Sequence, residues 1–168
     1  MHLLVWTVEL DQPEAVVAAL AGHLDEFEQH VAAARRAGVR RDRYVVAHGA
    51  VREILGALTG DGPDAVAIDR RCAHCGDPAH GKPALPEHEG LDFSLSHCRA
   101  TAIVAVARAV SVGVDVEVVR ARPHLERLAA RMLSPAEHAE WLTGDPAART
   151  IEFLRLWTAK EAYLKAVG

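Results

Sequence analysis

Two acidic residues on one short segment are the part of this sequence best suited to chemistry. In Gly113-Val114-Asp115-Val116-Glu117, an extended chain places Asp115 and Glu117 on one face and the valines on the other. Neighbouring carboxylates repel each other and attract a cation, and their oxygens favour Mg²⁺ or a similar hard ion over zinc. The alternative is an exposed strand face with two solvated acids, which is common on half-exposed strands.

A second group of charged residues lies near the end of the chain at helical spacing. Glu161 shares a helix face with Lys165. A carboxylate on the apolar side of a helix is costly unless a cation lies beside it. If this helix crosses the acidic strand, Glu161 becomes a third ligand beside Asp115 and Glu117. Lys160 and Lys165 would then line the rim, where phosphate oxygens bind. An ordinary Glu–Lys pair on a solvated face is the alternative.

Two shorter segments add groups that can hold phosphate. His97 lies at the end of an alternating strand and could donate to a phosphate, with Ser96 donating from the opposite side. Gly81-Lys82-Pro83 combines close backbone approach, one cation and a rigid turn. The alternative for His97, one of ten histidines, is a hydrogen-bonded histidine at a strand end with no ligand.

These four segments, in this order, resemble the motifs of the 4'-phosphopantetheinyl transferase superfamily, in its two-lobed Sfp-like class. The motifs of that family are G-[KR]-P, F-N-x-S-H-S, G-[IV]-D-[IV]-E and W-x-x-K-E-x-x-x-K. The matching stretches here are residues 81–83, 93–98, 113–117 and 157–165, with Ser94 in place of Asn and Cys98 in place of Ser. The resemblance extends from about Arg40 to the end of the chain.

The resemblance implies that the protein transfers 4'-phosphopantetheine from coenzyme A to a serine of a carrier protein. It would be a transferase of the holo-[acyl-carrier-protein] synthase type, with coenzyme A as co-substrate and an apo acyl or peptidyl carrier protein as partner. Fatty-acid, polyketide and nonribosomal peptide synthesis are the pathways open to it. A monomer that depends on Mg²⁺, or on Mn²⁺, is expected from the family.

The resemblance also implies roles for individual residues. Asp115, Glu117 and Glu161 would hold the metal, and Glu161, directly or through water, would be the general base. Lys165 and His97 would contact the diphosphate and act with Glu161 in catalysis, with Lys160 nearby. The adenine and 3'-phosphate end of coenzyme A would be bound by the remaining motif residues and two arginines of the second helix: Arg43, Arg52, Lys82, Pro83 and Ser96.

One cluster of candidate metal ligands lies outside these motifs. Cys72 and Cys75 have the C-x₂-C spacing of a zinc site, and His80 could supply a further ligand. Because only one such pair is present, His74 or another group would have to complete the site. Reduced thiols in a cytoplasmic protein are the alternative.

Three hypotheses therefore remain open. The first is an active transferase. The second is a truncated, weakly active or inactive module that binds coenzyme A or a carrier protein. It stays open because the family continues with further strands after the Lys165 helix, whereas this sequence ends at Gly168. The third is a zinc-stabilised structural domain, which leaves the register of Lys160, Glu161 and Lys165 unexplained.

Composition excludes several broad classes of protein. The 168 residues are 50% apolar and carry a net charge of -4, which does not favour binding to nucleic acid. The longest nearly continuous apolar run, residues 100–107, is far short of the roughly 20 residues of a membrane span. The first residues lack the basic region and cleavage site of a signal peptide. We expect a cytoplasmic protein.

The helices and strands expected to position these groups, together with the family resemblance, indicate an α+β fold. It would have two pseudo-symmetric lobes, each with a small antiparallel sheet packed on helices. The first lobe would span residues 1–99 and the second, incomplete at its C-terminus, residues 100–168, with coenzyme A between them. An incomplete lobe exposes a sheet edge and favours self-association. Periodicity and breaking residues predict strands at 4–10, 66–69, 92–97, 101–108 and 112–119, and helices at 13–38, 44–58, 125–132, from 134, and from about 145.

Overall fold

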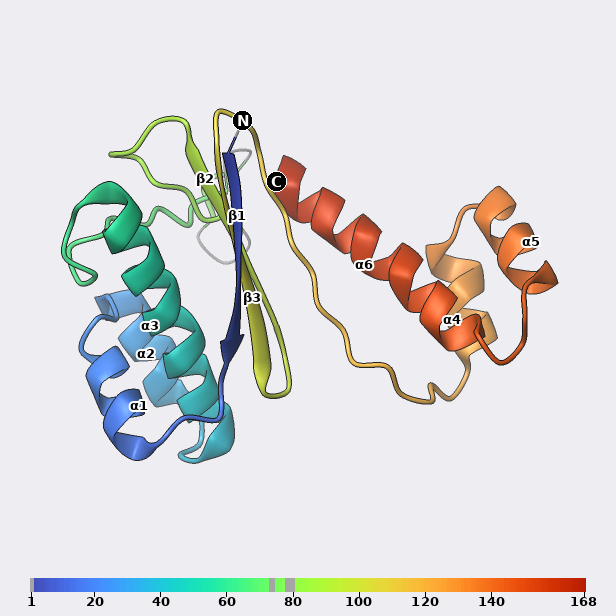
Figure 1. Cartoon of the computed structure of the whole chain (residues 1–168), viewed down its shortest axis with the longest axis horizontal. Helices are drawn as coiled ribbons and strands as arrows, with labels where there is room; N and C mark the ends of the chain where they lie inside the picture. The colour runs from blue at the N-terminus through green and yellow to red at the C-terminus, as the bar shows by residue number, and fades with distance from the viewer. Residues whose placement is uncertain (1, 73–74, 78–80) are drawn as a thin grey trace.

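Three antiparallel strands form the sheet on which the rest of the protein is assembled. The computed structural model describes residues 2–72, 75–77 and 81–168, and this part of the chain contains six helices. The strands β1 (His2–Glu9), β2 (Leu91–Cys98) and β3 (Thr101–Arg108) lie in the order β1-β3-β2 (Figure 1). β2 and β3 form a tight hairpin, with Cys98 opposite Thr101. The α+β fold class is confirmed.

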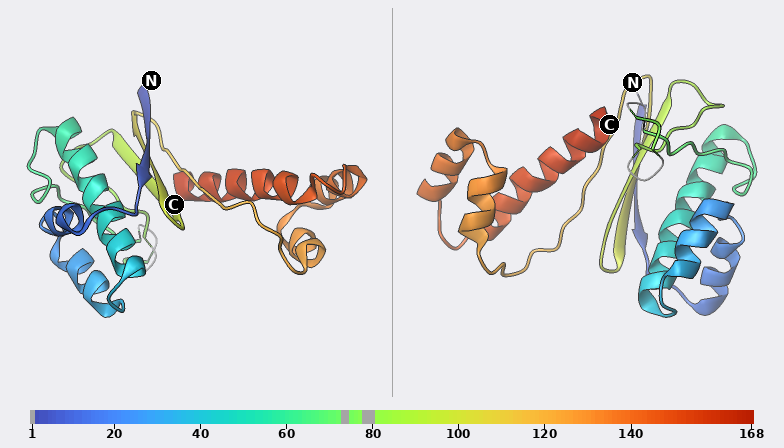
Figure 2. Two further views of the ribbon diagram at one scale, coloured as in Figure 1. Left: turned by 60° about the horizontal axis from the view of Figure 1, so that its bottom comes forward. Right: turned by 180° about the vertical axis from the view of Figure 1, so that it is seen from behind.

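Three helices cover one face of this sheet (Figure 2). They are α1 (Glu14–Ala21), α2 (Glu26–Ala34) and α3 (Val39–Thr59). The prediction of one helix over residues 13–38 is wrong because Asp25 starts a new helix. Its side chain accepts from the Glu28 amide, and the Glu28 side chain accepts from the Asp25 amide, which together form a capping box. The predicted helix around residues 44–58 is confirmed as α3.

The hydrophobic core lies between α3 and the sheet. Val51 and Leu55 of α3 pack with Phe93 of β2 and with Val104 and Val106 of β3, and all five are almost fully buried. The side chains at 93 and 95 of β2 therefore face the helices, while those at 94 and 96 face the other side of the sheet. This alternation decides what each β2 residue can contact.

The segment that follows β3 differs from its prediction. Residues 112–119 were expected to form a strand, but they are an extended chain that does not join the sheet. The amides of Val112, Val114 and Val116 donate to side chains of β2 and not to a neighbouring backbone. Because side chains stand out from a sheet, the segment lies over its face and forms no ladder. The strand expected at 66–69 is likewise reduced to a single bridge between Asp69 and Ala84.

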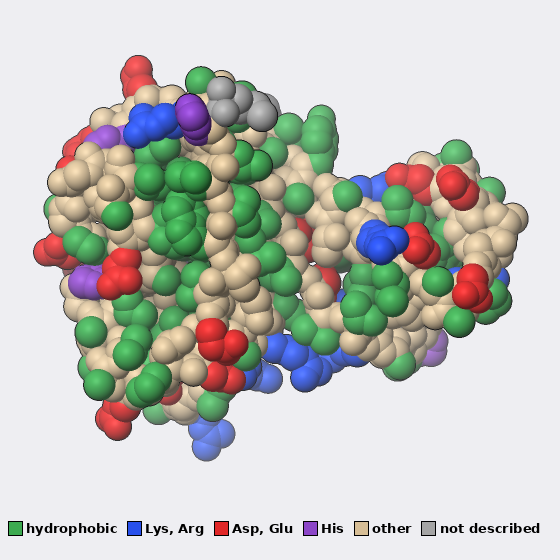
Figure 3. Space-filling model, viewed as in Figure 1, with side chains coloured by type: hydrophobic (Ala, Val, Ile, Leu, Met, Phe, Trp, Pro, Cys, Tyr) green, Lys and Arg blue, Asp and Glu red, His purple; other side chains and the backbone are tan. Residues whose placement is uncertain are grey.

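The remaining three helices form a cluster of their own. They are α4 (Leu125–Met132), α5 (Pro135–Thr143) and α6 (Arg149–Val167), packed around Trp141 and Phe153. The helix predicted from residue 134 is confirmed as α5, which begins with a capping box at Ser134 and has Pro135 in its first turn. This cluster extends away from the sheet, and the C-terminal end of α6 returns to it (Figure 1). In Figure 3 the sheet with its helices and the α4–α6 cluster are two bodies joined by a narrower region.

The boundary expected between residues 99 and 100 falls in the turn between β2 and β3. β3 lies at the centre of the sheet and pairs with β1 over the whole length of both strands. Within the described part of the chain, β3 is the only strand that residues 100–168 contribute. No helix among the described residues is long and apolar enough to cross a membrane.

Candidate functional site

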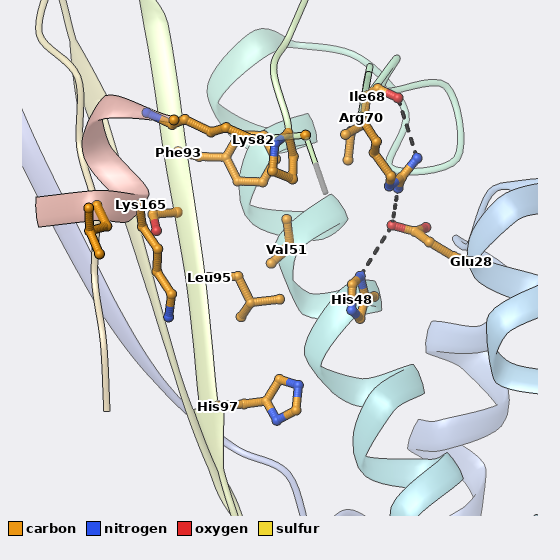
Figure 4. Close-up of a pocket in the computed structure, with 15 residues that line it drawn as sticks. Glu28, His48, Val51, Ile68, Arg70, Lys82, Phe93, Leu95, His97 and Lys165 are labelled. Carbon is orange, nitrogen blue, oxygen red and sulfur yellow. Dashed lines mark hydrogen bonds and ion pairs between the residues drawn. The ribbon is translucent and has the colours of Figure 1, made fainter. Parts of the chain in front are cut away.

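A cavity of about 480 Å³ lies along β2, which is an edge strand of the sheet, and residues of α3 also line it. Its walls come from α2, α3, β2, the loop before β2 and the C-terminal end of α6 (Figure 4). Segments that are far apart in the sequence therefore meet here. The motif residues that line it include Gly81, Lys82, Pro83, Ser94, His97 and Lys165.

Lys82 joins the loop before β2 to the end of α6. Its ammonium group donates to the Asp92 carboxylate at 2.6 Å and to the carbonyl oxygen of Ala166 at 3.0 Å. Gly81 allows the loop to turn here, since a Cβ on it would lie 2.0 Å from the Arg70 carbonyl oxygen. The G-K-P turn thus positions one cation at the cavity and ties it to the last helix.

His97 lies on the cavity wall near the end of β2. Partial burial lowers the pKa of its imidazole, and nearby His48, Arg35 and Lys165 lower it further by charge repulsion. The neutral form is therefore favoured at neutral pH in the ligand-free protein. An anion in the cavity would offset this repulsion and could accept a hydrogen bond from the ring.

Asp115 and Lys165 form the centre of the acidic side of the site. The Lys165 ammonium group donates to Asp115 Oδ1 at 2.7 Å, to Ser96 Oγ at 3.1 Å and to the Val114 carbonyl oxygen at 3.2 Å. Ser96 donates to the same Asp115 oxygen at 2.8 Å. Ser96 therefore orients the carboxylate from the sheet side, where the sequence had suggested a phosphate contact.

Gly113 is what brings α6 against this segment. A Cβ on Gly113 would lie 1.9 Å from the Ala162 carbonyl oxygen and 2.6 Å from the Ala166 amide nitrogen. Only a residue without a side chain allows such close approach of the helix backbone. The glycine of the G-V-D-V-E motif therefore sets the distance between Asp115 and the helix that carries Glu161 and Lys165.

The other two expected metal ligands have different surroundings. Glu117 accepts from Arg122 at 2.8 Å, and Glu161 is half-buried on α6. Within the described residues, no three His, Cys, Asp or Glu side chains form a group that could hold a metal ion. The carboxylate oxygens suit Mg²⁺ chemically, but Asp115 and Glu117 are neutralised here by Lys165 and Arg122. The Nε of Arg122 is buried without a hydrogen-bond partner.

Besides Ser96, three of the expected ligand-binding residues lie away from the cavity lining. Arg43 forms a two-point pair with Asp11, and Lys160 pairs with Glu137 at 2.6 Å. Arg52, which the family resemblance places at the adenine and 3'-phosphate end of coenzyme A, is fully buried. In the structure Arg52 pairs with Glu28 and Asp25.

A network of ionic side chains on the cavity wall was not predicted from the sequence. Glu28 of α2, His48 of α3 and Arg70 of the following loop all line the cavity (Figure 4). Arg70 donates to Glu28 at 2.6 Å and to Asp25 at 2.8 Å, and Arg52 pairs with both carboxylates from the buried side. The D-x-x-E spacing of the capping box was the one available signal, because it marks a helix start at Asp25.

The proposed zinc cluster lies partly outside the residues that the structure describes. Cys72 is half-buried and Cys75 is exposed, whereas His74 and His80 are among the residues that are not described. The zinc site therefore stays a prediction.

Cations and a histidine line one cavity of an α+β fold, and Lys165 of that lining pairs with Asp115 of the acidic segment. Comparisons with known proteins show the family. The family described as the 4'-phosphopantetheinyl transferase superfamily matches residues 111–168. The chain is 37% identical over 172 residues to the 4'-phosphopantetheinyl transferase HetI of Nostoc sp., covering 100% of this chain and 68% of that protein. The chain belongs to the 4'-phosphopantetheinyl transferase superfamily.

Two further relatives show how the similarity is distributed. A 4'-phosphopantetheinyl transferase of Bacillus subtilis is 26% identical over 166 residues, which is 98% of this chain and 70% of that protein. The 4'-phosphopantetheinyl transferase AcpT of Salmonella typhi is 39% identical over 88 residues, which is 52% of this chain and 46% of AcpT. The chain therefore matches about two thirds of the length of the first two relatives and less than half of the third.

Proposed function

We propose that this chain transfers the 4'-phosphopantetheine group of coenzyme A to a serine hydroxyl of an apo acyl or peptidyl carrier protein. The observation that supports this most is the meeting of three family motifs at one cavity. Lys82, His97 and Lys165 come from three separate segments and line the same walls. A diphosphate and a 3'-phosphate carry enough negative charge to suit this lining.

In the proposed reaction, the serine oxygen forms a bond to the phosphorus next to pantetheine, and the bond to 3',5'-adenosine diphosphate breaks. The serine proton goes to a base, for which we propose the half-buried Glu161, directly or through water. Lys165 and Lys82 would neutralise phosphate oxygens, and His97 would donate a hydrogen bond to one of them. Positioning and charge neutralisation account for most of the catalysis of such transfers.

We propose that Mg²⁺ is held by Asp115, Glu117 and Glu161, which the family motif supplies. Their hard oxygen ligands suit this ion, and it would neutralise charge on the diphosphate. In the structure Asp115 and Glu117 pair with Lys165 and Arg122. The ion would therefore replace two side-chain cations that already balance these carboxylates.

The test is mass spectrometry of an apo carrier protein incubated with this chain, coenzyme A and Mg²⁺. We expect the carrier to gain one phosphopantetheine group. The Glu117→Gln variant and an excess of chelator should each abolish most of the transfer. Glu126→Gln, at an exposed residue on α4, is the matched control and should transfer normally. Binding of coenzyme A without transfer would instead indicate a binding module.

A further inference from the structure

Glu28 is the most constrained acidic side chain in the protein. It is 1% exposed, and both of its oxygens accept hydrogen bonds from charged or backbone donors. Oε2 accepts from Arg52 and from the Asp25 amide, and Oε1 accepts from Arg70 at 2.6 Å. The His48 ring nitrogen Nδ1 lies 3.3 Å from the same Oε1. The mechanism proposed above assigns no role to this arrangement.

The ionisation of Glu28 fixes the state of the histidine beside it. Burial by itself would raise the pKa of Glu28, but hydrogen bonds from His48 and Arg52 outweigh burial and lower it to about 2. An ionised carboxylate only accepts hydrogen bonds, so Nδ1 of His48 must carry the proton that faces Glu28. In the neutral ring the other nitrogen, Nε2, is then the one that carries no proton and can act as an acceptor.

The groups around His48 differ from those around His97, the other histidine of the cavity. Glu28 of α2 lies at hydrogen-bond distance from His48, and Tyr44 of α3 packs on its ring at 4.1 Å between centroids. His97 of β2 faces His48 across the cavity, and repulsion from His48 contributes to the lowered pKa of His97. Lys165 of α6, Arg35 after α2 and Arg70 of the loop add positive charge nearby. Within the described part of the chain, His48 has a carboxylate partner and His97 has none.

We propose that His48 is a ligand-binding residue, oriented by Glu28, and that it takes up a proton at Nε2 when a phosphate monoester enters the cavity. The proton comes from the buffer, and the product is an imidazolium ion between the Glu28 carboxylate and the phosphate. This rests on the proposed function, in which the ligand is coenzyme A and the monoester is its 3'-phosphate. The diphosphate would lie toward Lys165, on the other side of β2 from His48 (Figure 4).

The proposal is tested by calorimetric titration of the full chain with coenzyme A in two buffers of different ionisation enthalpy, at about pH 7.5. The difference between the two heats counts the protons taken up on binding. We expect net uptake in the unchanged protein, and its loss in His48→Gln with affinity reduced at least about tenfold, as for one charge-assisted hydrogen bond. His30→Gln, at an exposed histidine of α2, is the matched control and should keep both.

The outcomes separate this proposal from the proposed function. Coenzyme A binding with equal proton uptake in His48→Gln would overturn the role of His48 alone. Equal uptake with dephospho-coenzyme A would overturn the assignment to the monoester. An absence of coenzyme A binding in the unchanged protein would overturn the proposed function together with this inference. Nitrogen chemical shifts of the ligand-free protein add a direct check, because a His48 tautomer protonated at Nε2 would contradict the hydrogen bond to Glu28.

Discussion

The two sides of the cavity balance their charges in different ways. On the α2–α3 side, the side chains of Arg52 and Glu28 are 0% and 2% exposed and each has several partners. On the side of the acidic segment, Lys165 and Glu117 are 35% and 28% exposed and rely on fewer contacts. Buried ion pairs are costly to break, whereas accessible ones exchange partners at little cost. We infer that the first side is a fixed wall and the second is the side that reorganises around a ligand.

The largest effect should come from removing the central cation of the fixed wall. Arg52→Met leaves Glu28 and Asp25 with one arginine fewer in a buried site, and we expect a loss of about 3–5 kcal/mol in the free energy of unfolding. Arg122→Gln, on the other side, should cost about 0–1 kcal/mol. Urea denaturation of both variants measures the difference. Similar losses would show that the two sides do not differ in this way.

Acid should weaken the fixed wall over a defined range of pH. The pKa of Glu28 is about 2 in the folded protein, below the value of 4.5 that the group has when unperturbed. A lowered carboxyl pKa stabilises the fold above about pH 4.5, and the contribution, about 3 kcal/mol, is lost as pH falls toward 2. Glu28→Gln should flatten this part of the stability curve, measured by urea denaturation at stepped pH. An unchanged slope in the variant would mean that another group is responsible.

A smaller effect is expected where the acidic segment meets α6. Gly113→Ala places a methyl group against the α6 backbone, and the helix must move to make room. We expect a loss of about 1–3 kcal/mol, as for other overpacked sites. Gly144→Ala adds the same group in a permissive conformation, φ -71, and should change stability little. Thermal unfolding of the two variants compares them, and equal midpoints would refute the close packing.

The smallest effect distinguishes two acids of similar pKa. Glu137 also has a pKa of about 2, chiefly because Lys160 donates to it, but both side chains are about a third exposed. Salt screens exposed charges much more than buried ones. Raising the ionic strength should therefore move the pKa of Glu137 toward 4.5 and leave that of Glu28 in place. Carbon NMR of the two carboxyl groups during an acid titration would show this, and parallel shifts would argue against it.

The sequence predicts most of the helices and strands, but not that the segment at 112–119 lies over the sheet without joining it. Helix α3 and strands β2 and β3 follow from periodicity, because each buries one regular face. The extended segment at 112–119 has the same alternation as a strand, and only its position over a sheet face prevents it from pairing. The alternation of apolar and polar residues shows which face of an extended segment is buried. It does not show which strand, if any, pairs with the backbone of that segment.

The candidate site was predicted in part for a related reason. Lys82, His97 and Lys165 belong to short motifs and do meet at one cavity. The burial of Arg52 could not be predicted, because its carboxylate partners, Glu28 and Asp25, belong to another helix and its N-terminal cap. Contacts between separate elements leave no regular spacing in the sequence. Glu28, His48 and Arg70 could therefore not be assigned to one network from the sequence.

The alternating contacts of β2 also restrict how this strand can vary. Its positions 92, 94 and 96 each supply the oxygen that accepts an amide of the extended segment, whereas 93 and 95 contact apolar side chains under the helices. A library of all single substitutions should therefore show tolerance with a period of two residues. Short side chains with an acceptor oxygen should be tolerated at positions 92, 94 and 96, and apolar side chains at positions 93 and 95. Within five consecutive residues, each face of the strand therefore tolerates a different kind of side chain.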